Sequence, residues 1–263
     1  MERKKEQILY VAGALLILAV LYFGFDTKPS SQQALEKSRA LSENTVDIHT
    51  LEKEARTHLD ANLTANVDAL QARLQLAQTD SARLESLKAL SGFWYQQNHP
   101  MLSGAYAMQV AEINQDADSW SIAGTTFAAA FKQPDPDDNV KTLARDQAIA
   151  AFEKAISLEP GVIEHRINQA LCYIEAPVTD QPMKGIQMLA GLATKYPESA
   201  LPPFHLARLA VQTGQMEKAE ERIEQALAAD STNQRIACLA GDIYRSNNKP
   251  ELAEKMERRC LGQ

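Results

Sequence analysis

The segments WSIAGTTF (residues 120–127) and AIAAFEKAISLEP (residues 148–160) decide the fold of this chain. In the first, a small residue, Gly124, precedes an aromatic one, Phe127, by three positions; in the second, small and bulky residues recur at steps of four and three up to Pro160. Such steps place side chains on one face of an α-helix. Small residues let two helices approach closely, while bulky ones fill the space beside them. The two segments therefore predict a helical hairpin.

The same pattern recurs along the chain. The expected first helices carry a small residue followed three positions later by a gap-filling one: Gly92/Tyr95, Gly124/Phe127, Ala170/Tyr173, Ala207/Ala210 and Gly241/Tyr244. The expected second helices carry small and bulky residues before a helix-ending position: Gly104, Met108, Ala111, Asp116; Ala148, Phe152, Ala155, Pro160; Gly185, Leu189, Leu192, Pro197; Ala219, Ile223, Ala226, Ser231; and Ala253, Met256, Cys260. Five hairpins in near-register predict a stack in which each hairpin covers the apolar face of its neighbour.

These residues resemble the tetratricopeptide repeat, whose pattern is W-x2-L-G-x2-Y, then A-x3-F, then P. The second unit matches best, although the segment from Lys132 to Lys141 lengthens its turn. A smaller insertion, from Ala176 to Met183, lies in the third unit, and the fourth has Ala210 in place of an aromatic residue. The resemblance implies an all-α fold with a solenoid of about five hairpins over residues 84–263.

Composition agrees with an all-helical fold and excludes several classes of protein. A hydrophobic fraction of 45% with only 6% aromatic residues suits helical packing. The net charge of -7 disfavours nucleic-acid binding, because neutralising phosphates needs clustered Lys and Arg. The sequence contains none of the motifs of zinc proteases, serine hydrolases or phosphate-binding loops. We therefore expect a non-enzymatic protein with no catalytic residues, no cofactor and no metal.

The N-terminal residues have the pattern of a membrane anchor. Three basic residues precede the uncharged segment Ile8–Phe25, which as a helix would span roughly 27 Å, close to the thickness of a bilayer core. A cleaved signal peptide is the alternative, but bulky residues stand where a peptidase needs small ones. We expect residues 1–6 to be a short cytoplasmic tail and 7–25 a single transmembrane anchor. The positive-inside rule then puts the repeats across the inner (cytoplasmic) membrane, in the periplasm of a bacterium.

Residues 26–83 are expected to form a linker and one long amphipathic helix. Its apolar positions advance at the helical period and form one stripe: Leu51, Ala55, Leu59, Leu63, Val67, Leu70, Leu74 and Ala77. The stripe could cap the first repeat, because the end of a solenoid must be covered. Alternatively, two such helices could self-associate beside the membrane. The drift of the stripe from a strict heptad favours the cap.

The resemblance also implies that a protein partner binds the concave face, which is lined by the first helix of each hairpin. The candidate groove residues are Phe93, Gln97, Thr125, Ile167, Leu171, Phe204, Arg208, Arg235, Asp242 and Arg245. An extended or helical peptide could place apolar side chains near the apolar members and an acidic group near the arginines. The Lys and Asn clamp with which some family members hold chaperone C-termini is not reproduced, which disfavours a cytosolic co-chaperone.

The three cysteines leave two alternatives open. If the last hairpin folds as the family does, Cys238 and Cys260 lie at matching heights on its two helices and could bond in an oxidising periplasm. Three buried, reduced thiols acting as small apolar residues are the favoured interpretation.

Two hypotheses for function remain. The first is a membrane-tethered scaffold or adaptor whose groove binds a peptide segment or nascent chain of a partner protein. The alternative is a homo-oligomeric structural component of an envelope complex, assembled through the helix expected over residues 48–77.

Overall fold

The computed structural model describes residues 48–134 and 138–262, which form twelve α-helices and one short 3-10 helix, without a β-strand. The elements are α3 (Ile48–Arg56), α4 (Ala61–Leu76), α5 (Asp80–Gln96), α6 (Pro100–Asn114), α7 (Ala117–Ala128), η1 (Ala129–Lys132), α8 (Asp138–Leu158), α9 (Ile163–Glu175), α10 (Lys184–Lys195), α11 (Leu201–Gln212), α12 (Met216–Ala229), α13 (Gln234–Ser246) and α14 (Pro250–Cys260). This confirms the all-helical prediction for these residues.

The anchor predicted at residues 7–25 lies outside the described residues. Within 48–134 and 138–262, no helix has both the length and the apolar character needed to cross a bilayer.

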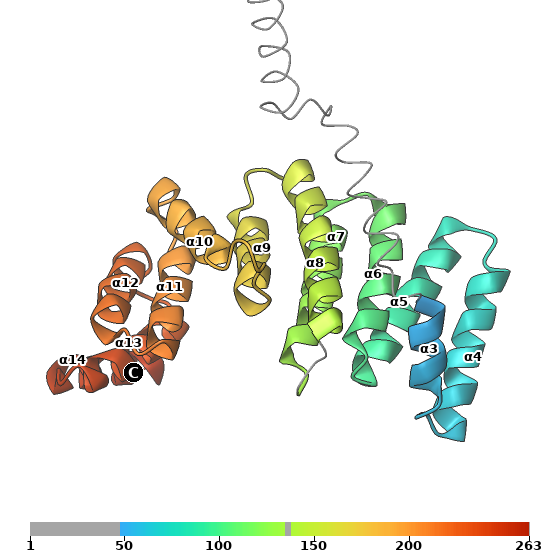
Figure 1. Cartoon of the computed structure of the whole chain (residues 1–263), viewed down its shortest axis with the longest axis horizontal. Coiled ribbons are helices and arrows are strands. Elements are labelled where there is room, and N and C mark those ends of the chain that lie inside the picture. The colour runs from blue at the N-terminus through green and yellow to red at the C-terminus, as the bar shows by residue number, and fades with distance from the viewer. Residues whose placement is uncertain (1–47, 135–137, 263) are drawn as a thin grey trace, which may run out of the picture. The chain divides into compact units, whose positions relative to one another are not determined.

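From α5 onward the helices pack as five hairpins in chain order, each hairpin on the next (Figure 1). The hairpins are α5/α6, α7/α8, α9/α10, α11/α12 and α13/α14. The first four second helices end just before Asp116, Pro160, Pro197 and Ser231, where the sequence predicts helix ends. Helix α8 begins at Asp138, inside the predicted insertion, whereas the insertion between α9 and α10 contains no helix. The expected number of hairpins is confirmed.

Small residues permit the closest approaches between these helices. A Cβ atom added to Gly104 of α6 would lie 2.6 Å from the ring of Phe127 on α7. One added to Gly124 of α7 would lie 2.8 Å from the ring of Phe152 on α8, and this ring is fully buried. One added to Gly185 of α10 would collide with the carbonyl oxygen of Ala170 on α9. At these three glycines, the predicted close packing is confirmed.

In the first hairpin the predicted pair was wrong by one position. Gly92 is exposed with no atom near its missing side chain, and Tyr95 is 59% exposed. The contact is made by Ser91, whose hydroxyl donates to the carbonyl oxygen of Ser103 at 2.9 Å, and by Trp94, which is fully buried. Burying the larger ring of Trp94 removes more apolar surface from water than burying Tyr95 would.

The predicted single helix before the repeats is two helices. The chain breaks after α3, and Asp60 then caps α4 by accepting a hydrogen bond from the backbone N–H of Leu63 at 2.8 Å. Ala55 of α3 and Val67 of α4 are buried in the same core cluster as Trp94. The apolar stripe therefore covers the first hairpin, as the cap interpretation expects.

A buried carboxylate joins the cap to the first hairpin. Glu52 of α3 is 5% exposed and accepts a hydrogen bond from the hydroxyl of Tyr106 on α6 at 2.9 Å. Arg56 donates to the same carboxylate at 3.1 Å, and Gln71 of α4 donates to it as well. Burial, followed by the charge of Glu52, raises the pKa of Tyr106 to about 12. Since a buried charge is tolerated only with such partners, this network holds three helices in one arrangement.

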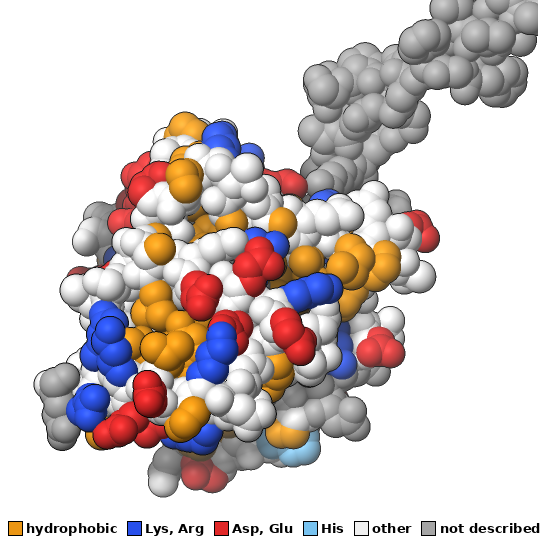
Figure 2. Space-filling view, turned by 90° about the vertical axis from the view of Figure 1, so that its left-hand side faces the viewer, with side chains coloured by type: hydrophobic (Ala, Val, Ile, Leu, Met, Phe, Trp, Pro, Cys, Tyr) orange, Lys and Arg blue, Asp and Glu red, His pale blue; other side chains and the backbone are white. Residues whose placement is uncertain are grey.

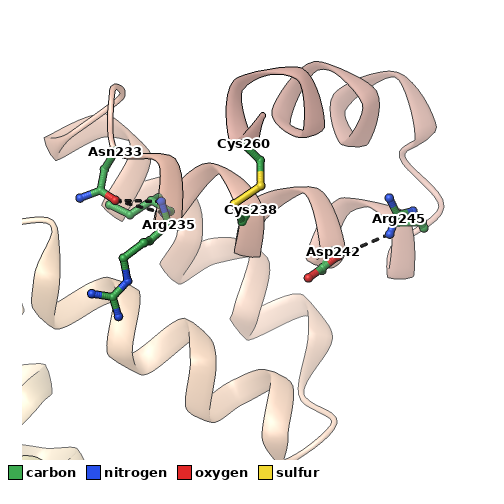
Figure 3. The surroundings of a disulfide bond; sticks show 7 residues. Asn233, Arg235, Cys238, Asp242, Arg245 and Cys260 are labelled. Carbon is green, nitrogen blue, oxygen red and sulfur yellow. Dashed lines mark hydrogen bonds and ion pairs between the residues drawn. A yellow bond between two sulfur atoms is a disulfide. The ribbon is translucent and has the colours of Figure 1, made fainter. Parts of the chain in front are cut away.

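A disulfide bond closes the last hairpin. Cys238 of α13 and Cys260 of α14 are bonded, with their Cα atoms 4.8 Å apart (Figure 3). The favoured prediction of three reduced thiols was therefore wrong for these two, because the antiparallel helices bring them within bonding distance. Cys172 is free and buried, and burial raises its pKa to about 12.

Replacing Gly124 by Ala tests the packing between hairpin helices. The added methyl group meets the buried ring of Phe152, so we expect the free energy of unfolding of the full chain to fall by about 1–3 kcal/mol in urea denaturation. Gly92→Ala is the matched control: nothing lies near its side-chain position, and removing a helical glycine should add about 0.5–1 kcal/mol. Equal effects at the two sites would contradict the packing argument.

Replacing Tyr106 by Phe tests the buried network. The change removes one donor from the Glu52 carboxylate, and we expect a loss of about 1–3 kcal/mol in the free energy of unfolding. Tyr95→Phe, on an exposed ring, should change stability by less than about 0.5 kcal/mol. If both variants unfold at the wild-type urea concentration, the network does not hold the cap.

The disulfide predicts a redox-dependent stability. Replacing both Cys238 and Cys260 by Ser opens a loop of 22 residues, for which we expect a loss of about 3 kcal/mol. Dithiothreitol should lower the stability of the wild type to that of the double variant and leave the variant unchanged. Mass spectrometry of alkylated, non-reduced protein should find Cys238 linked to Cys260 and Cys172 alkylated after unfolding; alkylation at all three would eliminate the bond.

Candidate functional site

The ten candidate groove residues differ in how far a partner could reach them. Phe93, Ile167 and Phe204 are buried, with 6%, 3% and 7% of their surface exposed, and belong to the core. Half-buried members are Gln97, Leu171 and Arg208, and exposed members are Thr125, Arg235, Asp242 and Arg245. The structure thus distributes these residues between core and surface on five first helices. Their role in binding a partner stays a prediction.

Two neighbouring first helices, α11 and α13, bring together the basic members of the set. Pro202 and Pro203 occupy the first turn of α11, where a missing backbone N–H costs nothing. Helix α13 is capped by Asn233, whose side chain accepts from the backbone N–H of Arg235 at 3.0 Å. This cap fixes Arg235 in the first turn of its helix, facing α11.

The side chains on these helices touch across the hairpin boundary. The guanidinium carbon of Arg235 lies 5.6 Å from the ring centroid of Phe204, within the range of a cation–π interaction. The rings of Phe204 and His205 meet edge to face, with centroids 5.4 Å apart. Arg208 follows His205 by three positions and therefore shares its side of α11.

The electrostatic environment of this group is basic. Burial, and then the charges of Arg208 and Arg235, lowers the pKa of His205 to about 4. The imidazole is therefore neutral at pH 7, beside two permanently charged guanidinium groups. Its Nδ1 atom and the Nε atom of Arg208 are buried without a hydrogen-bond partner.

Three other basic side chains at the C-terminal end, Arg245, Lys249 and Arg258, have acidic partners. Figure 2 shows this end of the molecule, with blue and red side chains interspersed around orange ones. The ion pairs are Arg245 with Asp242 at 3.4 Å and with Glu257, Lys249 with Glu220, and Arg258 with Glu254 at 2.9 Å. The hydrogen bond from Lys249 lowers the pKa of Glu220. Arg245, one of the predicted groove residues, thus already has its charge compensated within the last hairpin.

Two exposed apolar side chains on first helices are absent from the predicted groove residues. Tyr95 on α5 and Ile122 on α7 are each 59% exposed. The sequence offered one signal for the exposure of Tyr95. Ser91 and Trp94 have the same three-residue spacing as Gly92 and Tyr95, and a helix that buries Trp94 leaves Tyr95 exposed. We define the first-helix surface as the accessible side chains of these helices: Tyr95, Ile122, Thr125, Leu171, Arg208 and Arg235. Among the residues that the structure describes, no three His, Cys, Asp or Glu side chains are grouped to hold a metal ion.

Comparisons with known proteins agree with the repeat fold. The tetratricopeptide repeat family matches residues 204–233, from Phe204 of α11 through α12. This match confirms the repeat in the fourth unit and supports a protein-interaction scaffold, because stacked repeats present extended binding surfaces. No curated protein matches the chain.

Solved structures of MamA proteins are similar to this chain at low identity. The structure of MamA from residue 41 onward, from Desulfovibrio magneticus RS-1, is 14% identical, with 71% of this chain and 96% of that chain covered and a TM-score of 0.43. A structure of MamA AMB-1 is 16% identical, with 70% and 92% covered and a TM-score of 0.37.

Proposed function

We propose that this protein is a membrane-tethered scaffold that recruits a partner protein through its first-helix surface. The observation that carries the proposal is the exposure of Tyr95 and Ile122, two large apolar side chains on the first helices of successive hairpins. Tyr is one of the residue types enriched among the anchors of protein interfaces, and the exposed Ile122 adds apolar surface on the neighbouring hairpin. A partner segment that covers them would remove apolar surface from water without any change in the packed hairpins.

The tether is the uncharged segment Ile8–Phe25, preceded by basic residues. In this proposal the chain crosses the inner membrane once, with residues 1–6 in the cytoplasm and the repeats in the periplasm. The bond between Cys238 and Cys260 supports this placement, because disulfides persist in oxidising compartments and are rare in the cytosol.

The packing of the cap disfavours the alternative of a homo-oligomer assembled through residues 48–77. Ala55 and Val67, in the middle of the apolar stripe, are already buried against the first hairpin. Self-association through this stripe would require the cap to detach. In this proposal the scaffold acts through a surface that is already accessible, and without catalysis.

Site-specific photo-cross-linking in native membranes tests the proposal. A photoreactive residue at position 95 or 122 should capture the same partner protein. Leu158 on α8 and Leu252 on α14 are matched controls, because they are exposed apolar residues on second helices, and we expect no capture from them. Ile122→Asp should reduce capture from position 95 severalfold by placing a charge in the interface.

Two results would contradict the proposal. Equal capture from all four positions would show that the first helices have no special role. Cross-links only between copies of this chain would replace the recruitment model with self-assembly.

A further inference from the structure

The basic group on α11 and α13 lacks the acidic partners that Arg245, Lys249 and Arg258 have in the last hairpin. Within the described residues, neither Arg208 nor Arg235 forms an ion pair, and the Nε of Arg208 has no acceptor although it is buried. Figure 3 shows the guanidinium of Arg235 extending away from the disulfide, with no dashed line on it, whereas Arg245 on the same helix is joined to Asp242. A buried donor without an acceptor is a cost that proteins usually avoid.

The electrostatics of the group point to an anion. The guanidinium groups of Arg208 and Arg235 both lower the pKa of the His205 imidazole, and no acidic side chain raises it. This concentration of positive charge occurs in a chain with a net charge of -7. The first turn of α13, which carries Arg235, adds the positive end of a helix dipole.

We propose that His205, Arg208 and Arg235 form a binding site for a carboxylate on an acidic segment of the partner protein. This inference rests on the proposed scaffold function and names the chemistry by which the C-terminal part of the first-helix surface selects its partner. The guanidinium groups bind the two carboxylate oxygens through paired N–H donors. The imidazole of His205 packs beside both guanidinium groups and is neutral, so it adds no charge to the site.

A protein segment fits this site better than a polyanion such as nucleic acid. The site offers two charged side chains, and the carboxylates of Glu220, Asp242 and Glu254 lie on α12, α13 and α14 at the same end of the stack. A long run of phosphates would meet these charges, while one carboxylate on a peptide would not. The ring of Phe204 beneath Arg235 holds that guanidinium in place for an incoming group.

Fluorescence anisotropy with a labelled, end-capped octapeptide that carries one glutamate among neutral residues tests the site in the full chain at low salt. We expect saturable binding that Arg208→Gln and Arg235→Gln each weaken about tenfold. Arg208→Lys should recover less than the full affinity, because an ammonium group lacks the planar pair of donors. Arg245→Gln is the matched control: it removes the same charge from α13, but that charge is already paired, so we expect less than a twofold change.

The outcomes separate this inference from the proposed function. Absence of saturable binding, or an equal loss in Arg245→Gln, would overturn the carboxylate site. Inorganic phosphate displacing the peptide at lower concentration than acetate would overturn the assignment to a carboxylate. Thermal unfolding monitored by circular dichroism verifies that each variant is folded. The Arg235→Gln variant should disturb packing least, because the Arg235 side chain is exposed. Partner capture from Tyr95 and Ile122 without binding of the single-glutamate peptide would refute the site and leave the scaffold standing.

Discussion

The close approach of antiparallel helices at small residues is the constraint on which the rest of the structure depends. Gly104 lies against the ring of Phe127, and Gly124 lies against the ring of Phe152. Each contact joins one helix to the next along the chain. The glycine of one helix leaves the space that the aromatic ring of the next helix fills. Because every hairpin contacts mainly its neighbours, the stability of such a stack is a sum of local interfaces.

The two ends of the described stack are secured by different chemistry. At the N-terminal end, α3 and α4 cover the first hairpin, and the buried Glu52 fixes them through Tyr106, Arg56 and Gln71. At the C-terminal end, the disulfide and the ion pairs of α13 and α14 hold the last hairpin together. Terminal repeats have a neighbour on one side only, so these extra interactions replace the missing interface.

The sequence predicted which helices carry the accessible basic side chains, but not which candidate groove residues are buried. The repeat pattern placed the candidate site on the first helices, and Arg208 and Arg235 are accessible there. Phe93 lies in the core instead. Helix α5 turns the large ring of Trp94 into the core, and the neighbouring Phe93 is buried with it. Helical spacing alone could have grouped His205 with Arg208, but its closeness to Arg235 depends on how α11 packs against α13.

The sequence by itself determined the all-helical repeat, the number of hairpins and the residues at which the second helices end, because these follow from helical periodicity and local steric limits. Tertiary structure alone decided which residues form the first close contact and that Cys238 bonds to Cys260. It also decided that Arg245 is paired while Arg208 and Arg235 are not. Each of these depends on distances between side chains on different helices, which packing sets and a one-dimensional pattern does not record.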